Sequence, residues 1–327
     1  MIKISVASLL LFILTPGPLP LKAKDRAYAH RIVVAQDGSG DFTSIEKAVE
    51  SCKSFPYESI TIFIKNGVYH EKVRIPAWNT KITLAGESRD STIITYGDYF
   101  SKIGKGPNST FYTATLLVQG RDFKAENLTI ENSAGPVGQA IALDLEADRC
   151  QIINCRILGN QDTVYCAGAL ARQYFRNCTI IGTTDFIFGE ATALFEKCTL
   201  VIKSNSYFTA ASTPPYARFG FVFRDCTLKG APGINKALLG RPWRKYARTV
   251  WLHCEMDSCI SPRGWSNWND TANQRTVTYA EYQSTGPGAA TSRRASWAKT
   301  LSATEARHYS APEIFRGIPA WDPTRVR

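Results

Sequence analysis

Histidine is scarce in this chain, with four residues among 327, and the nine cysteines form no Cys-x-x-Cys pair. The sequence therefore offers no ligands with the spacing of a zinc site, and we expect neither a metal ion nor a cofactor. It also has no low-complexity segment and no linker-like stretch. We therefore expect a single domain over residues 30–320.

Long apolar runs are missing everywhere except at the N-terminus, where Lys3 precedes an apolar stretch over residues 4–14. That stretch is too short to cross a bilayer, and small residues follow it. The pattern predicts a signal peptide over residues 1–23, with cleavage near Ala23 or as late as Ala29. No cysteine lies near either position to carry a lipid. We expect a secreted, soluble monomer without a membrane anchor.

The formal net charge is +11, from 39 Lys and Arg against 28 Asp and Glu. A charge of this size predicts attraction to a polyanion. The basic residues are scattered and no nucleic-acid-binding motif is present, so nucleic acid is not the expected partner. An acidic polysaccharide satisfies the charge equally well.

A four-residue pattern recurs at intervals of about 20 to 28 residues, the period of solenoid proteins. Each copy has a turn residue, then Leu or Cys, a polar residue and an aliphatic residue. The copies begin at Asn127, Asn154, Asn177, Lys197, Asp225 and His253. Strand alternation places the Cys and the aliphatic residue on one face. The repeat predicts an all-β parallel β-helix, in which each coil stacks on the one before.

Five cysteines share one place in this repeat, namely Cys155, Cys178, Cys198, Cys226 and Cys254. Disulfides are the default expectation for an exported protein. Cysteines stacked on successive coils would compete for partners, however, so we favour a ladder of small buried thiols. A bridge among the four remaining cysteines stays open.

Two elements are expected outside the coils. Thr43 or Ser44 is a candidate N-cap for a short amphipathic helix that begins near Ile45. Beyond Trp251 the repeat fades. The C-terminal extension is expected to form a short helix that packs on the outside or caps the last coil.

The candidate chemistry centres on Asp185, which is followed directly by Phe-Ile-Phe. Apolar neighbours desolvate a carboxylate and raise its pKa, so a basic partner is expected, and Arg241 is the candidate. Gln139, Gln161 with Asp162, and Asp185 fall on successive predicted coils and could line one face. Two carboxylates, an arginine and nearby amides suit acid/base or acyl-transfer chemistry. Each residue taken alone fits a turn or a structural ion pair.

Five segments resemble the signatures of the pectin methylesterase family, in order and spacing. They are residues 67–71, 139–143, 161–164, 185–189 and 239–243. Residues 205–213 resemble bacterial members of the family in particular. The resemblance implies a right-handed parallel β-helix that hydrolyses C6 methyl esters of homogalacturonan to pectate and methanol. Two residues depart from the family: Val164 stands where Leu is usual, and Glu190 where plant members usually have Asn.

The resemblance also implies a role for each site residue. Asp185 would be the nucleophile, Asp162 the general acid and then the base, and Arg241 the partner that keeps Asp185 ionised. Gln139 and Gln161 would stabilise the oxyanion. Four aromatic residues match positions that line the sugar cleft, namely Tyr165, Phe186, Trp243 and Trp265.

Two other functions remain open from the residues alone. One is a calcium-dependent β-helix pectate lyase, which would need clustered carboxylates, whereas those here alternate with Gln and aromatic residues. The other is a non-catalytic solenoid that binds acidic glycans. Trp243, Trp265 and Trp268 are equally compatible with sugar platforms and with core positions.

Overall fold

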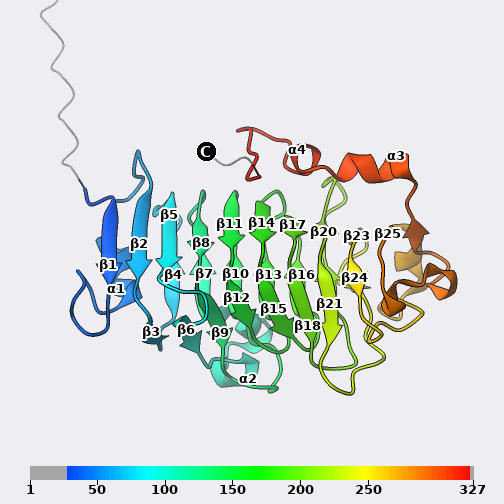
Figure 1. The fold of residues 1–327 in the computed structure, drawn as a ribbon, viewed down its shortest axis with the longest axis horizontal. Helices are drawn as coiled ribbons and strands as arrows, with labels where there is room; N and C mark the ends of the chain where they lie inside the picture. The colour runs from blue at the N-terminus through cyan, green and yellow to red at the C-terminus, as the bar shows by residue number, and fades with distance from the viewer. Residues whose placement is uncertain (1–27, 325–327) are drawn as a thin grey trace, which may run out of the picture.

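The predicted repeat forms the body of the protein. The computed structural model describes residues 28–324, which stack as successive coils along one long axis (Figure 1). Neighbouring strands pair in parallel, each with the strands one coil before and after it. The expected all-β, right-handed parallel β-helix is therefore confirmed. The predicted signal peptide, residues 1–23, lies outside the described residues.

The coils build three parallel sheets, of which sheet A has 11 strands. These are β1 (Arg31–Val34), β2 (Ile60–Ile64), β5 (Ile82–Gly86), β8 (Lys124–Glu126), β11 (Cys150–Ile153), β14 (Arg172–Arg176), β17 (Thr192–Glu196), β20 (Phe221–Arg224), β23 (Arg248–Leu252), β25 (Thr278–Tyr282) and β26 (Lys299–Thr300).

Sheet B has eight strands and sheet C has seven. The strands of sheet B are β3 (Gly67–Tyr69), β6 (Thr92–Tyr96), β9 (Thr129–Asn132), β12 (Arg156–Leu158), β15 (Thr179–Gly182), β18 (Thr199–Ile202), β21 (Thr227–Gly230) and β24 (Glu255–Met256). Those of sheet C are β4 (Val73–Ile75), β7 (Leu116–Val118), β10 (Leu143–Leu145), β13 (Val164–Cys166), β16 (Ile187–Gly189), β19 (Thr209–Ala211) and β22 (Arg241–Pro242).

The turn residue of each repeat has a left-handed backbone, and this residue turns the chain from sheet A into sheet B. The φ angles lie between 50° and 55° at Asn127, Asn154, Asn177, Lys197, Asp225 and His253. Asn and Asp tolerate this conformation better than most residues, because their short polar side chains bond locally. The repeat in the sequence therefore marks the positions where the chain turns from sheet A into sheet B.

The five repeat cysteines form the predicted ladder. Each is at most 1% exposed, and all nine cysteines of the chain are free thiols. Four of the ladder thiols donate to a backbone carbonyl of the preceding coil, as Cys178 Sγ does to the oxygen of Ile152 at 3.2 Å. The same core contains a stack of rings with centroids 3.8–4.5 Å apart, formed by Phe175, Phe195, Phe223 and Trp251.

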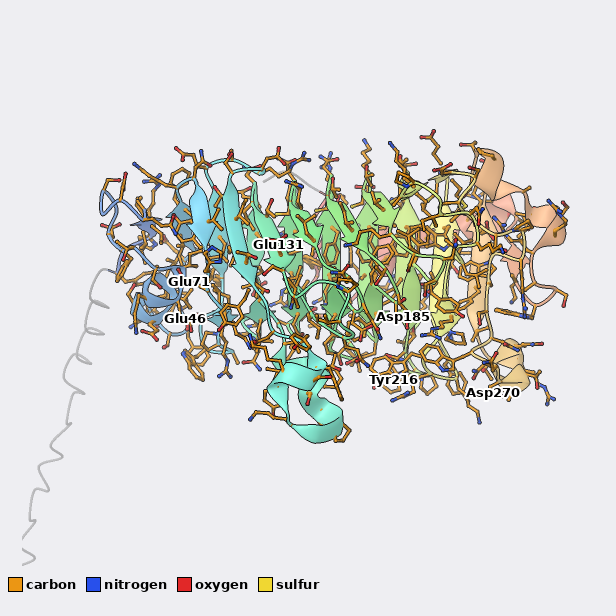
Figure 2. All side chains as sticks on the ribbon, turned by 90° about the horizontal axis from the view of Figure 1, so that it is seen from below. Glu46, Glu71, Glu131, Asp185, Tyr216 and Asp270 are labelled. Carbon is orange, nitrogen blue, oxygen red and sulfur yellow. The ribbon has the colours of Figure 1, made fainter. Side chains whose placement is uncertain are left out.

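The N-terminal helix α1 (Ile45–Ser51) forms as predicted, with Ser44 as its N-cap. The Glu71 carboxylate accepts from Ser44 Oγ at 2.8 Å and from the backbone amides of Ile45 and Glu46. A carboxylate at a helix N-terminus satisfies free amides and stabilises the helix dipole. Figure 2 shows Glu46 and Glu71 side by side at the N-terminal end of the stack. The 67–71 segment thus anchors α1 and is structural.

The C-terminal extension packs on the outside of sheet A. Helices α3 (Ala303–Ala306) and α4 (Ala311–Ile314) run back over this sheet in red (Figure 1). Ile314 and Phe315 are buried with Leu194, Val222 and Val250, which project from the outer face of the sheet. Of the two expected arrangements, packing on the outside is therefore the one adopted.

The remaining short helices lie in loops. They are α2 (Phe100–Ile103), η1 (Gly106–Tyr112), η2 (Thr271–Arg275), η3 (Pro287–Ala289), η4 (Thr291–Arg293) and η5 (Arg307–Tyr309). The α2–η1 segment projects from the body of the β-helix between β6 and β7 (Figure 2). Phe111 from η1 contacts sheet C, so this loop contributes to the surface described next.

Candidate active site

One row of side chains runs along the outer face of sheet C. In register from coil to coil it contains Asp144, Tyr165, Phe188, Ala210 and Arg241. The residues on either side of each position are buried, because side chains alternate across a strand. The five side chains of this row, which are far apart in the sequence, therefore share one surface.

Asp185 lies at the turn into β16, where its φ angle is 49°. The side chain is nearly buried, at 5% exposed. Arg241 donates to it through Nε to Oδ1 at 3.0 Å and through Nη2 to Oδ2 at 2.6 Å. A bidentate pair of this kind fixes both the charge and the orientation of the carboxylate. The basic partner expected for Asp185 is present.

The Arg241 guanidinium is itself held between two aromatic rings. Its central carbon lies 4.2 Å from the Tyr207 ring centroid and 3.7 Å from that of Trp268. Cation–π contacts with both rings help to fix the guanidinium while leaving its donors free for Asp185. The sequence left Trp268 open between a sugar platform and a core position and did not single out Tyr207. The only signal was the aromatic character of the two loops that carry them.

Asp162 occupies the same place one coil earlier, with a φ angle of 62°. Its backbone amide donates to the Thr184 carbonyl at 3.1 Å, next to Asp185, so the two carboxylates lie on adjacent coils. Adjacent strands are about 4.8 Å apart. Left-handed non-glycine residues are strained and gather at functional sites, where surrounding structure holds them.

The two carboxylates differ in their electrostatic environment. Burial raises the pKa of Asp162 well above its usual range, and the charge of Asp185 raises it further. Burial also raises the pKa of Asp185, but the hydrogen bonds and charge of Arg241 oppose the rise. Asp162 therefore retains its proton to higher pH than Asp185 does. This is the division expected between an acid and a nucleophile.

Gln139 and Gln161 are also brought together. They face each other in a parallel bridge on neighbouring coils, and the Ala140 amide donates to the Gln161 carbonyl at 3.1 Å. Both side chains are partly exposed, and Gln161 directly precedes Asp162. Two amides beside a carboxylate pair offer neutral donors for a developing oxyanion.

Two aromatic residues expected at the sugar cleft face the core. Phe186 and Trp265 are 0% exposed. Phe186 packs against Phe208 inside the β-helix, and the Trp265 indole stacks on Tyr279. The prediction that these two residues lie at an open surface is therefore wrong. The left-handed turn at Asp185 interrupts strand alternation, so both residues after it point inward.

Phe188 takes the outward position that was expected of Phe186. Its ring stacks on Tyr165 at 4.6 Å and lies 5.9 Å from Trp243. Phe111 lies 5.2 Å from Tyr165 and extends the same cluster. Of the predicted substrate-binding residues, Tyr165 and Trp243 thus share an aromatic outer surface. Counting alternation from Ile187 would have found Phe188.

This arrangement matches known proteins over most of the chain. The family model described as Pectinesterase matches residues 31–317. The chain belongs to the pectinesterase family. Pectinesterase 31 of Arabidopsis thaliana is 38% identical over 291 residues, which cover 86% of this chain and 91% of the relative. The carrot pectin methylesterase structure has a TM-score of 0.82 at 34% identity, covering 89% and 94%.

A pectin methylesterase solved with a bound hexasaccharide is also similar, with a TM-score of 0.78 and 27% identity, covering 92% of this chain and all of that one. Several longer Arabidopsis relatives carry the name pectinesterase/pectinesterase inhibitor, and this chain spans 41–64% of their length. Membership makes this pectinesterase a carboxylic ester hydrolase that acts on pectin. Its expected likeness to bacterial members stays a prediction. Across residues 28–324, no helix combines the length and apolar character needed to span a membrane.

Proposed function

We propose that this chain hydrolyses the C6 methyl esters of homogalacturonan through an acyl-enzyme on Asp185. The observation that carries the assignment of roles is the difference between two neighbouring carboxylates. Asp185 is held by Arg241 in a bidentate pair, whereas the pKa of Asp162 is raised by burial and by Asp185. One carboxylate is thereby available as an anion and the other as an acid.

In the first step, an ionised Asp185 oxygen attacks the ester carbonyl carbon. The carbonyl oxygen becomes an oxyanion, and the side-chain amides of Gln139 and Gln161 donate to it. Collapse of this intermediate breaks the bond to the methoxy oxygen. Asp162 transfers its proton to that oxygen, so methanol leaves and Asp162 becomes a carboxylate. The product is an anhydride between Asp185 and the uronate.

In the second step, Asp162 removes a proton from water, whose oxygen attacks the uronate carbon of the anhydride. The bond to Asp185 breaks, which returns Asp185 as a carboxylate held by Arg241. Asp162 is protonated again, and the uronate leaves as a carboxylic acid that ionises in water. The cycle consumes one water per ester and needs no external acid or base.

The substrate is expected to lie along the outer face of sheet C. The aromatic surface of Tyr165, Phe188 and Trp243 provides apolar area beside the two carboxylates. Aromatic faces are suited to sugar rings and methyl groups. A similar pectin methylesterase binds a hexasaccharide, which supports a binding face several sugar residues long. We also propose that the protein is secreted after removal of its signal peptide and acts as a monomer without a membrane anchor.

The test is methanol release from highly methylated pectin in the presence of EDTA. The wild-type protein should release methanol, and Asp185→Asn and Asp162→Asn should lose at least about 10²-fold of that rate. Asp225→Asn is a matched control, since Asp225 lies at a left-handed turn far from sheet C and Asn tolerates that backbone. Unsaturated products formed only with calcium would assign the protein to the lyases. Pectin binding without either product would leave a binding solenoid.

A further inference from the structure

Asp144 is a buried carboxyl group that the proposed mechanism does not use. It belongs to the outward row of sheet C, in register with Leu117 on one side and Tyr165 on the other. The residue is 0% exposed, and neither carboxyl oxygen has a hydrogen-bond partner. Buried carboxyl groups normally have partners, so an orphaned one on the binding face requires an explanation.

The surroundings of Asp144 are acidic. Glu190 accepts from the Gly168 amide at 2.8 Å and from the Tyr165 hydroxyl at 3.4 Å. Glu146 lies two residues from Asp144 on the same coil and accepts from Gln119 at 2.6 Å. Burial, and then the charges of Glu146 and Glu190, raise the pKa of Asp144 well above its usual range. Asp144 therefore keeps its proton to higher pH than an ordinary carboxyl group does.

No basic side chain of the outward row lies next to Tyr165, although Arg172 and Arg218 line one pocket with Glu146. In the outward row, the next cation toward the N-terminus is Arg74, two strands from Asp144, and its guanidinium is held by Gln119. In the other direction the next cation is Arg241, which is engaged by Asp185. Among residues 28–324, no group of three acidic, His or Cys side chains is arranged to hold a metal ion. A bound cation is therefore not the expected counter-charge.

A uronate carboxylate placed against Tyr165 would meet the same negative charges, of Glu146 and Glu190, that help to raise the pKa of Asp144. A methyl ester would not, because it carries no charge and its methyl group suits the apolar surface of Phe111, Leu117 and Tyr165. Like charges brought together without a cation are disfavoured, and this is a common basis of specificity.

We propose that the Tyr165 end of the outer face of sheet C, bounded by Asp144, Glu146 and Glu190, is a subsite that selects methyl-esterified galacturonate over free galacturonate. This inference rests on the proposed function, since it assumes that a pectin chain lies along this face. It assigns a specificity role to residues outside the catalytic group. The consequence is that the enzyme discriminates against stretches of pectin that have already lost their esters on this side.

The variants that test the proposal remove charge and keep shape. Glu190→Gln retains one acceptor oxygen for the Gly168 amide, and its NH2 group can donate to the Tyr165 hydroxyl. Glu146→Gln retains an acceptor for Gln119. If one variant does not fold, the other still tests the idea. Asp225→Asn is the control, because it removes one negative charge from an exposed turn between sheets A and B. Thermal melts establish that each variant is folded before binding is measured.

The readout is direct binding by calorimetry of polygalacturonate and of its fully methyl-esterified form, on an Asp185→Ala background so that no ester is consumed. Glu190→Gln and Glu146→Gln should each shift the ratio of the two affinities toward polygalacturonate by roughly threefold to tenfold. The shift should shrink at high salt, where charge repulsion is screened. An equal shift in Asp225→Asn, or an unchanged ratio in both folded test variants, would overturn the subsite.

These experiments test the proposed function and the proposed subsite separately. Absence of methanol release by the wild-type protein would contradict the proposed function, whereas the affinity ratio tests the subsite without catalysis. Failure of both polymers to bind the Asp185→Ala protein would overturn the subsite.

Discussion

The guanidinium of Arg241 holds both oxygens of Asp185, with Nε 3.0 Å from Oδ1 and Nη2 2.6 Å from Oδ2. The two residues are 56 positions apart in the sequence. The β-helix brings them together because Arg241 is two coils beyond Asp185 on the same sheet. Several consequences of this pair and of its surroundings can be measured.

Replacement of Arg241 by lysine should disable the site while keeping the charge. Lysine supplies a point charge but not two parallel donors, so the orientation of Asp185 is lost. We expect kcat to fall by about 10²-fold or more. The acid limb of the pH profile should move to higher pH, since Arg241 opposes the rise in the pKa of Asp185. Arg218→Lys, in an exposed ion pair with Glu313, should keep the wild-type rate and profile. A wild-type profile in Arg241→Lys would contradict the assignment.

The pH profile of the activity should be bell-shaped. Asp185 must be ionised to attack, so activity falls as pH decreases through its pKa, which burial raises above the usual range. Asp162 must be protonated to release methanol, so activity falls as pH increases through its pKa, which is raised further. Methanol release in a single buffer series measures both limbs. Asp162→Asn should remove the alkaline limb from the residual activity, and its persistence there would show that another group is the acid.

Trp268 should act as a positioning residue through Arg241. Its ring lies 3.7 Å from the guanidinium carbon, and it is 37% exposed, so its removal should cost little stability. We expect Trp268→Ala to reduce kcat by about threefold to thirtyfold, in line with a cation–π contact of about 0.5–2 kcal/mol. Trp268→Phe should restore part of the loss. A change in KM alone, with kcat intact, would instead indicate a contact with substrate only.

Phe186 and Phe188 should respond differently to truncation, although they are two residues apart. Phe186 is enclosed in the main core, so Phe186→Ala should lower stability by about 3–5 kcal/mol. Phe188 lies on the outer surface with Tyr165 and Trp243, so Phe188→Ala should mainly raise KM for pectin. Denaturant unfolding and methanol-release kinetics on both variants make the comparison. A larger loss of stability in Phe188→Ala would reverse the two assignments.

Asp144→Asn should stabilise the protein at neutral pH. The unfolded carboxyl ionises near pH 3.9, whereas the folded pKa is raised well above that value. Wild-type stability therefore falls as pH rises above about 3.9, because only the unfolded state gains the charge. The benefit of Asn should grow by about 1.4 kcal/mol per pH unit until the folded pKa is reached, and should vanish below about pH 4. Melts at pH 4 and pH 7 test this, with the exposed Asp225→Asn as control. If wild type and Asp144→Asn melt at the same temperature as each other at pH 4 and again at pH 7, Asp144 ionises normally.

The sequence by itself determined the coil and the pairing of Asp185 with Arg241. The turn residue and the Leu or Cys of each repeat predicted the β-helix, because a left-handed turn followed by a buried side chain recurs at six passages from sheet A to sheet B. The apolar residues after Asp185 likewise predicted a basic partner, and Arg241 is that partner. These are local requirements of backbone geometry and desolvation, so a local pattern records them.

The tertiary structure alone decided which aromatic residues face outward and which charges share a surface. Phe186 and Trp265 look like platform residues in sequence, but a turn that interrupts alternation and a loop that folds inward bury them. Tyr207 and Trp268 reach Arg241 from different loops. Asp144 and Glu146 approach Tyr165 from the coil before it, and Glu190 from the coil after it. Such groupings depend on the register between coils. Stacking of the whole β-helix sets this register, so it cannot be predicted from any one segment of the sequence.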